Sequence, residues 1–204
     1  MSDKALFDVV RAIVGRGLTQ SEVDRINAAI AAKVDAASPS RDGRGVSKAA
    51  INLIHSFESF KANAYKDPGS VNGLPITIGW GSTSDLQGRP IKMGDVWTRE
   101  YADAKFAQDL ARFEMGVNLL LDGAPTTQSQ FDALVSFAYN VGLDNDGDGK
   151  AEGLGDSTLL KRHKFGDYAG AKAQFALWNK NDGKVLAGLT RRRAAEAEMY
   201  GRAL

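Results

Sequence analysis

The sequence of 204 residues contains no cysteine, which excludes a disulfide framework and thiolate-bound metal sites. It has only two histidines, His55 and His163, and we find no acid–histidine–nucleophile set around either. No apolar run approaches the ~18 residues of a membrane-crossing helix, and the first residues lack a secretory signal pattern, so we expect neither feature. The composition, 43% hydrophobic and 25% charged, indicates a globular protein with its own core.

The net charge is only +1, but its distribution along the chain is uneven. From residue 158 onward the sequence contains ten lysines and arginines but four acids, which gives a local net charge of +6. A basic lobe suits an anionic polymer, such as peptidoglycan with its attached acids, or nucleic acid. The alternative is a set of solvated helix faces, and charge alone does not separate the two.

Apolar residues at helical spacing predict two helices within residues 4–36, and a capping box of Thr19 and Glu22 begins the second. Two such helices bury too little surface to fold alone, so we expect them to dock on the main body. The alternative is a separate module for wall anchoring or self-association. The expected organisation is an appendage at 1–37, a polar linker at 38–45 and one domain at 46–204.

The segment from Ser47 to about Phe60 has the pattern of an amphipathic helix, with Ser47 as its N-cap. Glu58 falls at the edge of the apolar face of this helix. Desolvation at such a place favours the neutral form of a carboxyl group, as a general acid requires. The alternative is that Glu58 is only part of the amphipathic surface.

A β-hairpin is predicted directly after this helix. A short strand ends at Asp67, a turn rich in glycine, proline and asparagine follows, and Thr77 lies in the return strand. Period-two alternation puts Ile76, Ile78 and Trp80 on an inward face, and Thr77, Gly79 and Gly81 on the other. We expect a sugar ring to lie against the bare backbone of this second face. The alternative is that Asp67 only starts a turn and Thr77 only favours a strand.

The stretch FESFKANAYKDPGSVNGLPITIGWGST resembles the catalytic motif of the phage-type lysozymes, or endolysins, of glycoside hydrolase family 24. In that family a Glu is followed after eight residues by an Asp, and a Thr later opens a TIG-aromatic-G run. Glu58 and Asp67 keep the eight-residue gap, and Thr77 opens TIGWG. Two further blocks, at 136–142 and 157–196, resemble later helices of the family in the expected order.

The resemblance implies roles for three residues. Glu58 donates a proton to the leaving glycosidic oxygen, while ionised Asp67 supports the oxocarbenium-like transition state and, with Thr77, positions the attacking water. This inverting arrangement needs no cofactor, and the bond implied is the β-1,4 link after N-acetylmuramic acid. Nine residues separate Asp67 from Thr77 where the short family pattern has five, so we expect a longer hairpin. Ser82 stands where many relatives carry His, and we assign it no role.

Three consecutive arginines, Arg191, Arg192 and Arg193, lie at the start of the last predicted helix. The family places an arginine from this region near the catalytic Glu, and the sequence does not distinguish among the three. The alternative is a solvated basic turn. Helices are predicted at 98–121, 127–142, Ser157–Lys164, Asp167–Trp178 and Leu189–Tyr200.

The loop at residues 144–156 is rich in aspartate and glycine. Asp144, Asp146 and Asp148 match the opening of a calcium-binding loop of the EF-hand type, which makes them a candidate structural calcium site. The match fails at position twelve, where Gly155 replaces the bidentate Glu. We therefore favour an acidic, glycine-rich insertion and expect no cofactor or catalytic metal.

We expect an α+β fold that is mainly α-helical, a lysozyme-like two-lobed fold with one small β-hairpin sheet lining the cleft, plus the N-terminal helical hairpin. The expected function is that of a muramidase, an endolysin that hydrolyses peptidoglycan for phage-induced lysis. Two alternatives remain open, a lytic transglycosylase acting on the same bond and a non-catalytic wall-binding or interaction module.

The expected partner is the peptidoglycan glycan strand, with no nucleic acid, no stable membrane anchor and a monomeric state. We expect synthesis in the host bacterial cytoplasm and action on the periplasmic cell wall.

Overall fold

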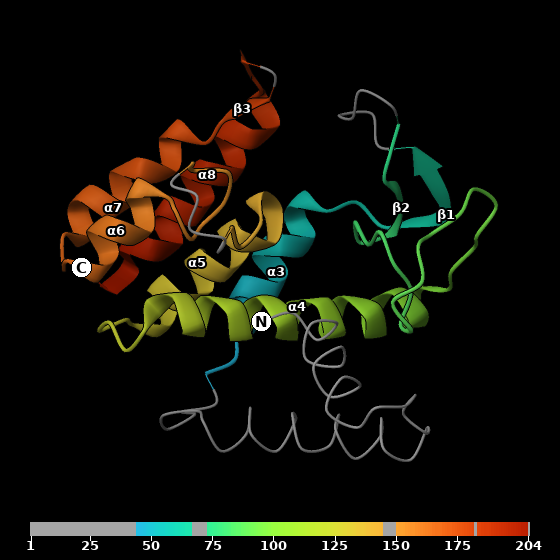
Figure 1. Ribbon diagram of the computed structural model, residues 1–204, viewed down its shortest axis with the longest axis horizontal. Coiled ribbons are helices and arrows are strands. Elements are labelled where there is room, and N and C mark those ends of the chain that lie inside the picture. The colour runs from blue at the N-terminus through green and yellow to red at the C-terminus, as the bar shows by residue number, and fades with distance from the viewer. Residues whose placement is uncertain (1–43, 67–72, 145–149, 182, 204) are drawn as a thin grey trace, which may run out of the picture. The chain divides into compact units, whose positions relative to one another are not determined.

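The computed structural model describes residues 44–66, 73–144, 150–181 and 183–203. Arg44 to the C-terminus forms one compact unit, and this unit is described here (Figure 1). The predicted N-terminal helical hairpin (1–37), residues 38–43 of the predicted linker, Asp67, Asp146 and Asp148 lie outside the described residues. The helices are α3 (Lys48–Phe57), α4 (Arg99–Leu121), α5 (Gln128–Val141), α6 (Thr158–Lys164), α7 (Tyr168–Gln174) and α8 (Ala187–Tyr200), with 3₁₀ turns η1 (Phe175–Leu177) and η2 (Gly201–Ala203).

The long helix α4 connects two groups of elements. Figure 1 shows β1 and β2 beside one end of α4, and α5 to α8 beside the other. We call residues 61–98 the small lobe and α5 to α8 the large lobe. Thr98 begins α4, as predicted, because its side chain accepts a hydrogen bond from the Tyr101 N–H. Its buried apolar face comprises Ala102, Phe106, Leu110, Phe113, Val117 and Leu121.

Helix α5 is the centre of the large lobe. It begins with a capping box, in which Thr127 and Gln130 satisfy each other's backbone N–H groups. Every residue from 130 to 138 is buried, because α8, α4 and α3 pack around it. The N-terminus of α3 is fixed to this core through Ser47, whose backbone N–H donates to Asp132 at 2.9 Å. Helix α3, which ends at Glu58, is therefore attached directly to α5, the most buried helix.

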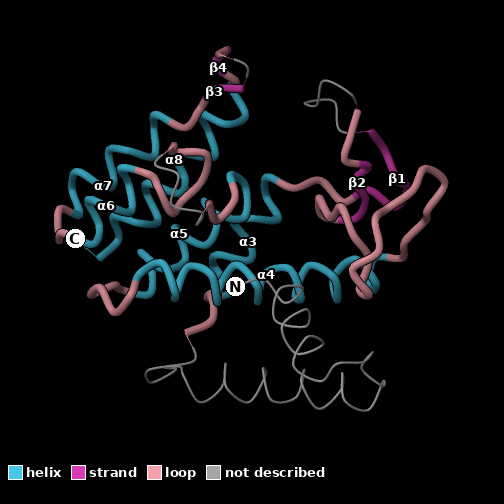
Figure 2. The backbone as a smooth tube through the Cα atoms, viewed as in Figure 1, coloured by secondary structure: helices cyan, strands magenta, loops and turns pink. Residues whose placement is uncertain are grey.

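Two small antiparallel sheets occur among the described residues. The expected sheet pairs β1 (Lys61–Lys66) with β2 (Ile76–Gly79). The second sheet pairs β3 (Lys180–Asn181) with β4 (Lys184–Val185) and was not predicted. Its strands of two residues are too short to give an alternating pattern, so the sequence indicates only the turn between them. Figure 2 shows that loops make up much of the remaining small lobe.

The predicted helix boundaries differ from the observed ones at three places. Helix α3 ends at Phe57 instead of Phe60, since Glu58 takes an extended conformation as its C-cap. The segment after Asp167 becomes 3₁₀ at Phe175, and α8 begins at Ala187, two residues before the predicted Leu189. Helix ends are set by tertiary contacts as much as by local propensity.

Candidate active site

Glu58 is the residue at which α3 stops. Its backbone N–H still donates to the Ile54 carbonyl at 3.0 Å, but its φ of −96° and ψ of 117° are those of an extended chain. The side chain therefore leaves the line of the helix and is 22% exposed. The helix therefore holds the backbone of Glu58, while its carboxyl group is partly accessible to solvent.

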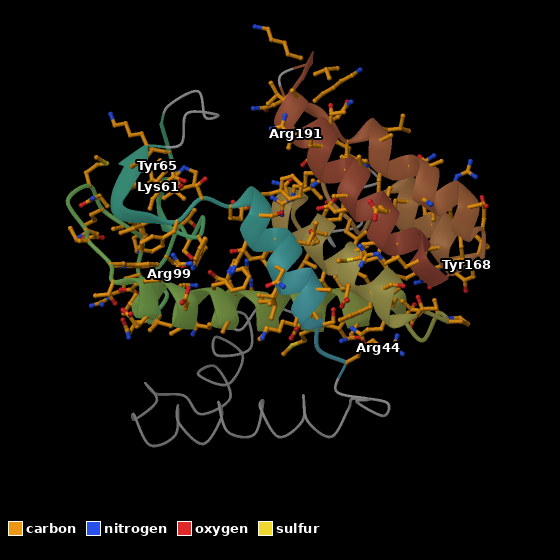
Figure 3. The ribbon with its side chains drawn as sticks, turned by 180° about the vertical axis from the view of Figure 1, so that it is seen from behind. Arg44, Lys61, Tyr65, Arg99, Tyr168 and Arg191 are labelled. Carbon is orange, nitrogen blue, oxygen red and sulfur yellow. The ribbon has the colours of Figure 1, made fainter. Side chains whose placement is uncertain are left out.

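Arg192 on α8 is the partner of this carboxyl group. Its Nη1 donates to Glu58 Oε1 at 2.6 Å, and its own side chain is only 5% exposed. This contact distinguishes among the three consecutive arginines. Arg191 is exposed and lies on the large lobe, well away from Lys61 and Tyr65 of the small lobe (Figure 3). Arg193 is buried and turns toward Glu196.

The backbone of the TIGWG run passes close to Glu58. Ile78 and Ser82 exchange both backbone hydrogen bonds, at 3.0 and 2.9 Å, and so close a tight turn. The turn needs glycine at both Gly79, with φ of 66°, and Gly81, with φ of 97°. A Cβ atom built on Gly81 would lie 3.5 Å from Glu58 Oε2. The run therefore presents bare backbone to one side of the candidate acid.

The prediction that this face of the return strand is open to a sugar is wrong at Gly79. A Cβ atom there would meet Trp97 at 3.0 Å and Ala102 at 3.1 Å, so this face is covered by protein. Thr77 on the same strand is only 7% exposed. The reason is the left-handed conformation of Gly79, which ends the period-two alternation that the prediction extended to Gly81. Of the two glycines on this face, Gly81 is the one that lies beside the carboxyl group.

Trp80 is fixed by contacts that the sequence did not reveal. Its ring stacks on His55 with centroids 4.2 Å apart, and its Nε1–H donates to Asp103 at 2.6 Å. The Tyr139 hydroxyl donates to the Trp80 carbonyl at 3.2 Å. Burial, followed by the charges of Glu58 and Asp109, raises the Tyr139 pKa, which keeps this hydroxyl a donor.

Both histidines pack against aromatic rings. The His163 ring is 1% exposed, with Nε2 at 2.8 Å from Thr126 Oγ1 and Nδ1 at 2.6 Å from the Tyr200 hydroxyl. Burial lowers the pKa of His163 to about 4. Burial also lowers the pKa of His55, which lies between Trp80 and Phe106.

Ser82, to which we assigned no role, belongs to a buried polar group under the turn. Its Oγ donates to Asp109 Oδ2 at 3.1 Å, and the other oxygen of Asp109 pairs with the Lys105 ammonium. Lys105 is 4% exposed and Asp109 19%. Ser82, at the position where many relatives carry His, thus bonds to Asp109. Lys105 of α4 is the cation that pairs with this acid.

Thr77 pairs with Tyr65 in the β1–β2 register, so the strand returns it to the level of the residues just before Asp67. Asp67 lies outside the described residues, and its role stays a prediction. A hollow of about 390 Å³ on the small lobe is lined by residues from Asp85 to Tyr101 and by neither Glu58 nor Thr77. The cleft expected between the lobes also stays a prediction.

Of the three aspartates in the candidate calcium site, Asp144 is the one that the structure describes. Its Oδ2 accepts hydrogen bonds from the backbone N–H groups of Glu152 and Gly153, both at 2.9 Å. This carboxylate therefore stabilises the second half of the loop itself. Across the described residues no group of three or more metal-ligating side chains occurs, and Asp146 and Asp148 lie outside them.

Comparison with known proteins adds to this geometry. The family model described as phage lysozyme matches residues 55–196. The endolysin of Bacillus phage B103 is 40% identical over 159 residues, which are 76% of this chain and 53% of that protein. The endolysin of Acyrthosiphon pisum secondary endosymbiont phage 1 is 33% identical and covered over 97% of its length. The chain spans about half the length of the first two curated relatives it matches.

Solved structures show the same relationship. The endolysin from Escherichia coli O157:H7 phage FAHEc1 superposes with a TM-score of 0.64 at 34% identity, covering 78% of this chain and 94% of that one. The muramidase domain of SpmX from Asticaccaulis excentricus superposes with a TM-score of 0.63 at 33% identity, covering 78% and 98%. The fold is therefore that of a lysozyme-like protein. The chain belongs to the phage lysozyme family.

Within the described ranges no helix is both long and apolar enough to span a bilayer.

The positive surface of the large lobe is smaller than the count of ten basic residues suggests, since Arg192 and Arg193 are buried.

Proposed function

We propose that this protein is a peptidoglycan muramidase, an endolysin that hydrolyses the β-1,4 bond between N-acetylmuramic acid and N-acetylglucosamine. The observation that carries the proposal is the 2.6 Å contact between Arg192 and Glu58, because it joins the first and last blocks of the family motif at one carboxyl group. Family membership and relatives named endolysin and muramidase support the same substrate.

Glu58 acts as the general acid. In glycoside hydrolysis one carboxylic acid protonates the leaving oxygen while the bond to the sugar carbon breaks. The bare backbone of Gly81 lies beside the carboxyl group and leaves room for a sugar ring to approach Oε2. Arg192 holds the opposite oxygen and so directs the free one.

Asp67 supplies the second carboxylate, and Thr77 helps it to orient the attacking water. In an inverting enzyme this water stands on the far side of the sugar ring, so the two carboxyl groups are ~6.5–9.5 Å apart. The β1–β2 register supports a joint role for Thr77 and Asp67, because Thr77 pairs with Tyr65 near the end of the strand that leads to Asp67. The reaction needs no cofactor.

The biological role that follows is lysis of a bacterial host by a phage or prophage. The protein is made in the host cytoplasm, works as a monomer and acts on the periplasmic wall. Its partner is the glycan strand. Relatives named SAR-endolysin support action at the cell wall.

The decisive variant is Glu58→Gln, which removes the donated proton and keeps the size of the side chain. We expect the rate of muropeptide release from purified peptidoglycan to fall by about 100-fold or more, while the circular dichroism spectrum stays that of the wild type. Glu198→Gln on α8 is the matched control, since Glu198 is 76% exposed, and it should lyse permeabilised Gram-negative cells normally. Lysis by Glu58→Gln at the wild-type rate would reject the proposal.

The mass of the products separates hydrolysis from the transglycosylase alternative. Hydrolysis adds one water to each cleaved bond, whereas a transglycosylase leaves an anhydro sugar. A wild-type protein that binds peptidoglycan and releases no fragment would instead be the non-catalytic module.

A further inference from the structure

A buried ionic cluster lies directly behind Arg192. Its centre is Glu196, which is fully buried on α8, one helical turn after Arg192. Glu196 Oε1 accepts three hydrogen bonds, from Ser136 Oγ at 2.8 Å, Arg192 Nε at 3.1 Å and Arg193 Nη2 at 3.1 Å. Glu196 Oε2 makes a close ionic contact of 2.8 Å with Arg193 Nε. Glu196 thus contacts both arginines, and Arg192 in addition contacts Glu58.

The contacts of Arg192 are divided among the edges of its guanidinium group. Nε donates to Glu196, Nη2 to the Ser136 carbonyl at 3.4 Å, and Nη1 to Glu58. A planar guanidinium has a rigid arrangement of donors, so fixing two of them fixes the direction of the third. The direction of the Nη1–H bond to Glu58 is therefore set from within the core, independently of Glu58.

We propose that Glu196 is a positioning residue for Glu58, acting through Arg192, and that the Ser136 hydroxyl orients Glu196 for this task. The inference rests on the proposed function, since it assigns how the general acid is held. Glu196 is fully buried, so it does not act on the sugar directly. It decides where the oxygen of Glu58 stands when the leaving group arrives, and a misplacement of about 1 Å can cost a rate of the order of 100-fold.

The competing explanation is that the cluster only attaches α8 to α5. A purely structural cluster would change the stability of the protein and leave the turnover of each folded molecule unaltered. The two explanations therefore differ in kcat measured per folded protein, and not in the melting temperature.

The chain offers a matched pair of serines for this test. Ser136 and Ser157 are both fully buried, and each donates one hydrogen bond through its hydroxyl, Ser136 to Glu196 and Ser157 to the Leu154 carbonyl at 2.6 Å. Ser157 caps α6, and its hydroxyl bonds to the backbone of Leu154 and Leu160. Ser136→Ala should lower kcat about 10-fold, with KM for soluble peptidoglycan fragments nearly unchanged. Ser157→Ala should lower the melting temperature and leave kcat unchanged.

A double-variant cycle then tests the route through Arg192. In an Arg192→Lys background the guanidinium fork is absent, so Ser136→Ala should give no further loss of kcat. Glu196→Gln, which removes the charge and keeps the shape, should lower kcat more than Ser136→Ala. If Glu196→Gln does not fold, Ser136→Ala still decides the question.

Equal kcat values for Ser136→Ala and Ser157→Ala would overturn the positioning role. So would a full additional loss from Ser136→Ala in the Arg192→Lys background. The proposed function fails in a different way, since then the wild-type protein itself would release no muropeptides.

Discussion

Glu58 Oε1 and Arg192 Nη1 lie 2.6 Å apart although 134 positions separate the two residues in the chain. The first residue ends α3 and the second lies in α8, and both helices pack on α5. The candidate acid is thus held by two rigid elements, and not by a loop. Sites supported in this way keep their geometry when loops around them move.

Thr77→Ala should slow hydrolysis by about 10- to 100-fold if its hydroxyl orients the attacking water. Thr77→Ser keeps the hydroxyl and should retain most of the wild-type rate of muropeptide release. The comparison is informative because, within the part of the chain that the structure describes, the hydroxyl donates one long hydrogen bond of 3.4 Å to the Pro75 carbonyl. Asp67→Asn should reduce the rate at least as much as Thr77→Ala. A Thr77→Ser protein as slow as Thr77→Ala would assign the effect to the packing of the methyl group.

Gly81→Ala should reduce activity more than its effect on stability explains. Both Gly81, with φ of 97°, and Gly88, with φ of 78°, have left-handed backbone, so an alanine at either costs about 1 kcal/mol of stability. Only at Gly81 would the added Cβ stand 3.5 Å from Glu58, whereas nothing lies within 4 Å at Gly88. We expect chemical denaturation to give similar losses for both variants, and kcat/KM to fall for Gly81→Ala alone. An equal fall for Gly88→Ala would contradict this explanation.

His163 should make the protein less stable as the solution becomes acidic. Its pKa falls from an ordinary value of 6.5 to about 4 in the folded state because the ring is buried. Between these values the unfolded chain binds a proton that the folded protein does not, so the free energy of unfolding decreases as the pH falls from 6.5 to 4. The total loss from this group is about 3 kcal/mol.

Urea denaturation measured across this pH range checks the effect. His163→Gln should be less stable at pH 7, since it loses the ring contacts with Tyr168 and Tyr200, but its stability should depend less steeply on pH. Identical slopes for the wild type and the variant would show that other groups cause the acid sensitivity.

Lys105→Met should destabilise the protein by about 1–3 kcal/mol, because Asp109 then loses its counter-charge and keeps only Ser82. The loss should stay below the ~3–5 kcal/mol of a fully buried broken pair, since Asp109 is 19% exposed. The matched control is Arg89→Met, which breaks another pair with a spacing of four residues. Arg89 is 72% exposed, so thermal unfolding should register a change of less than about 1 kcal/mol.

Local patterns predicted most of the helical elements. Capping residues such as Ser47, Thr98 and Thr127 begin the helices that the sequence indicated, because a side-chain oxygen and a free backbone N–H lie within one turn of each other. The alternation of β2 failed where a single left-handed glycine, Gly79, changed the direction of the chain. The β3–β4 sheet was missed because its four paired residues carry no measurable pattern.

By itself the sequence determined the family motif around Glu58, the mainly helical class and the order of the elements, since each depends on residues close together in the chain. Only the tertiary structure selected Arg192 from three adjacent arginines and joined it to Glu196 and Ser136. Consecutive residues on a helix point about 100° apart, so which of them reaches a distant carboxyl group depends on how α8 is rotated against α5. That rotation is decided by the packing of the whole core.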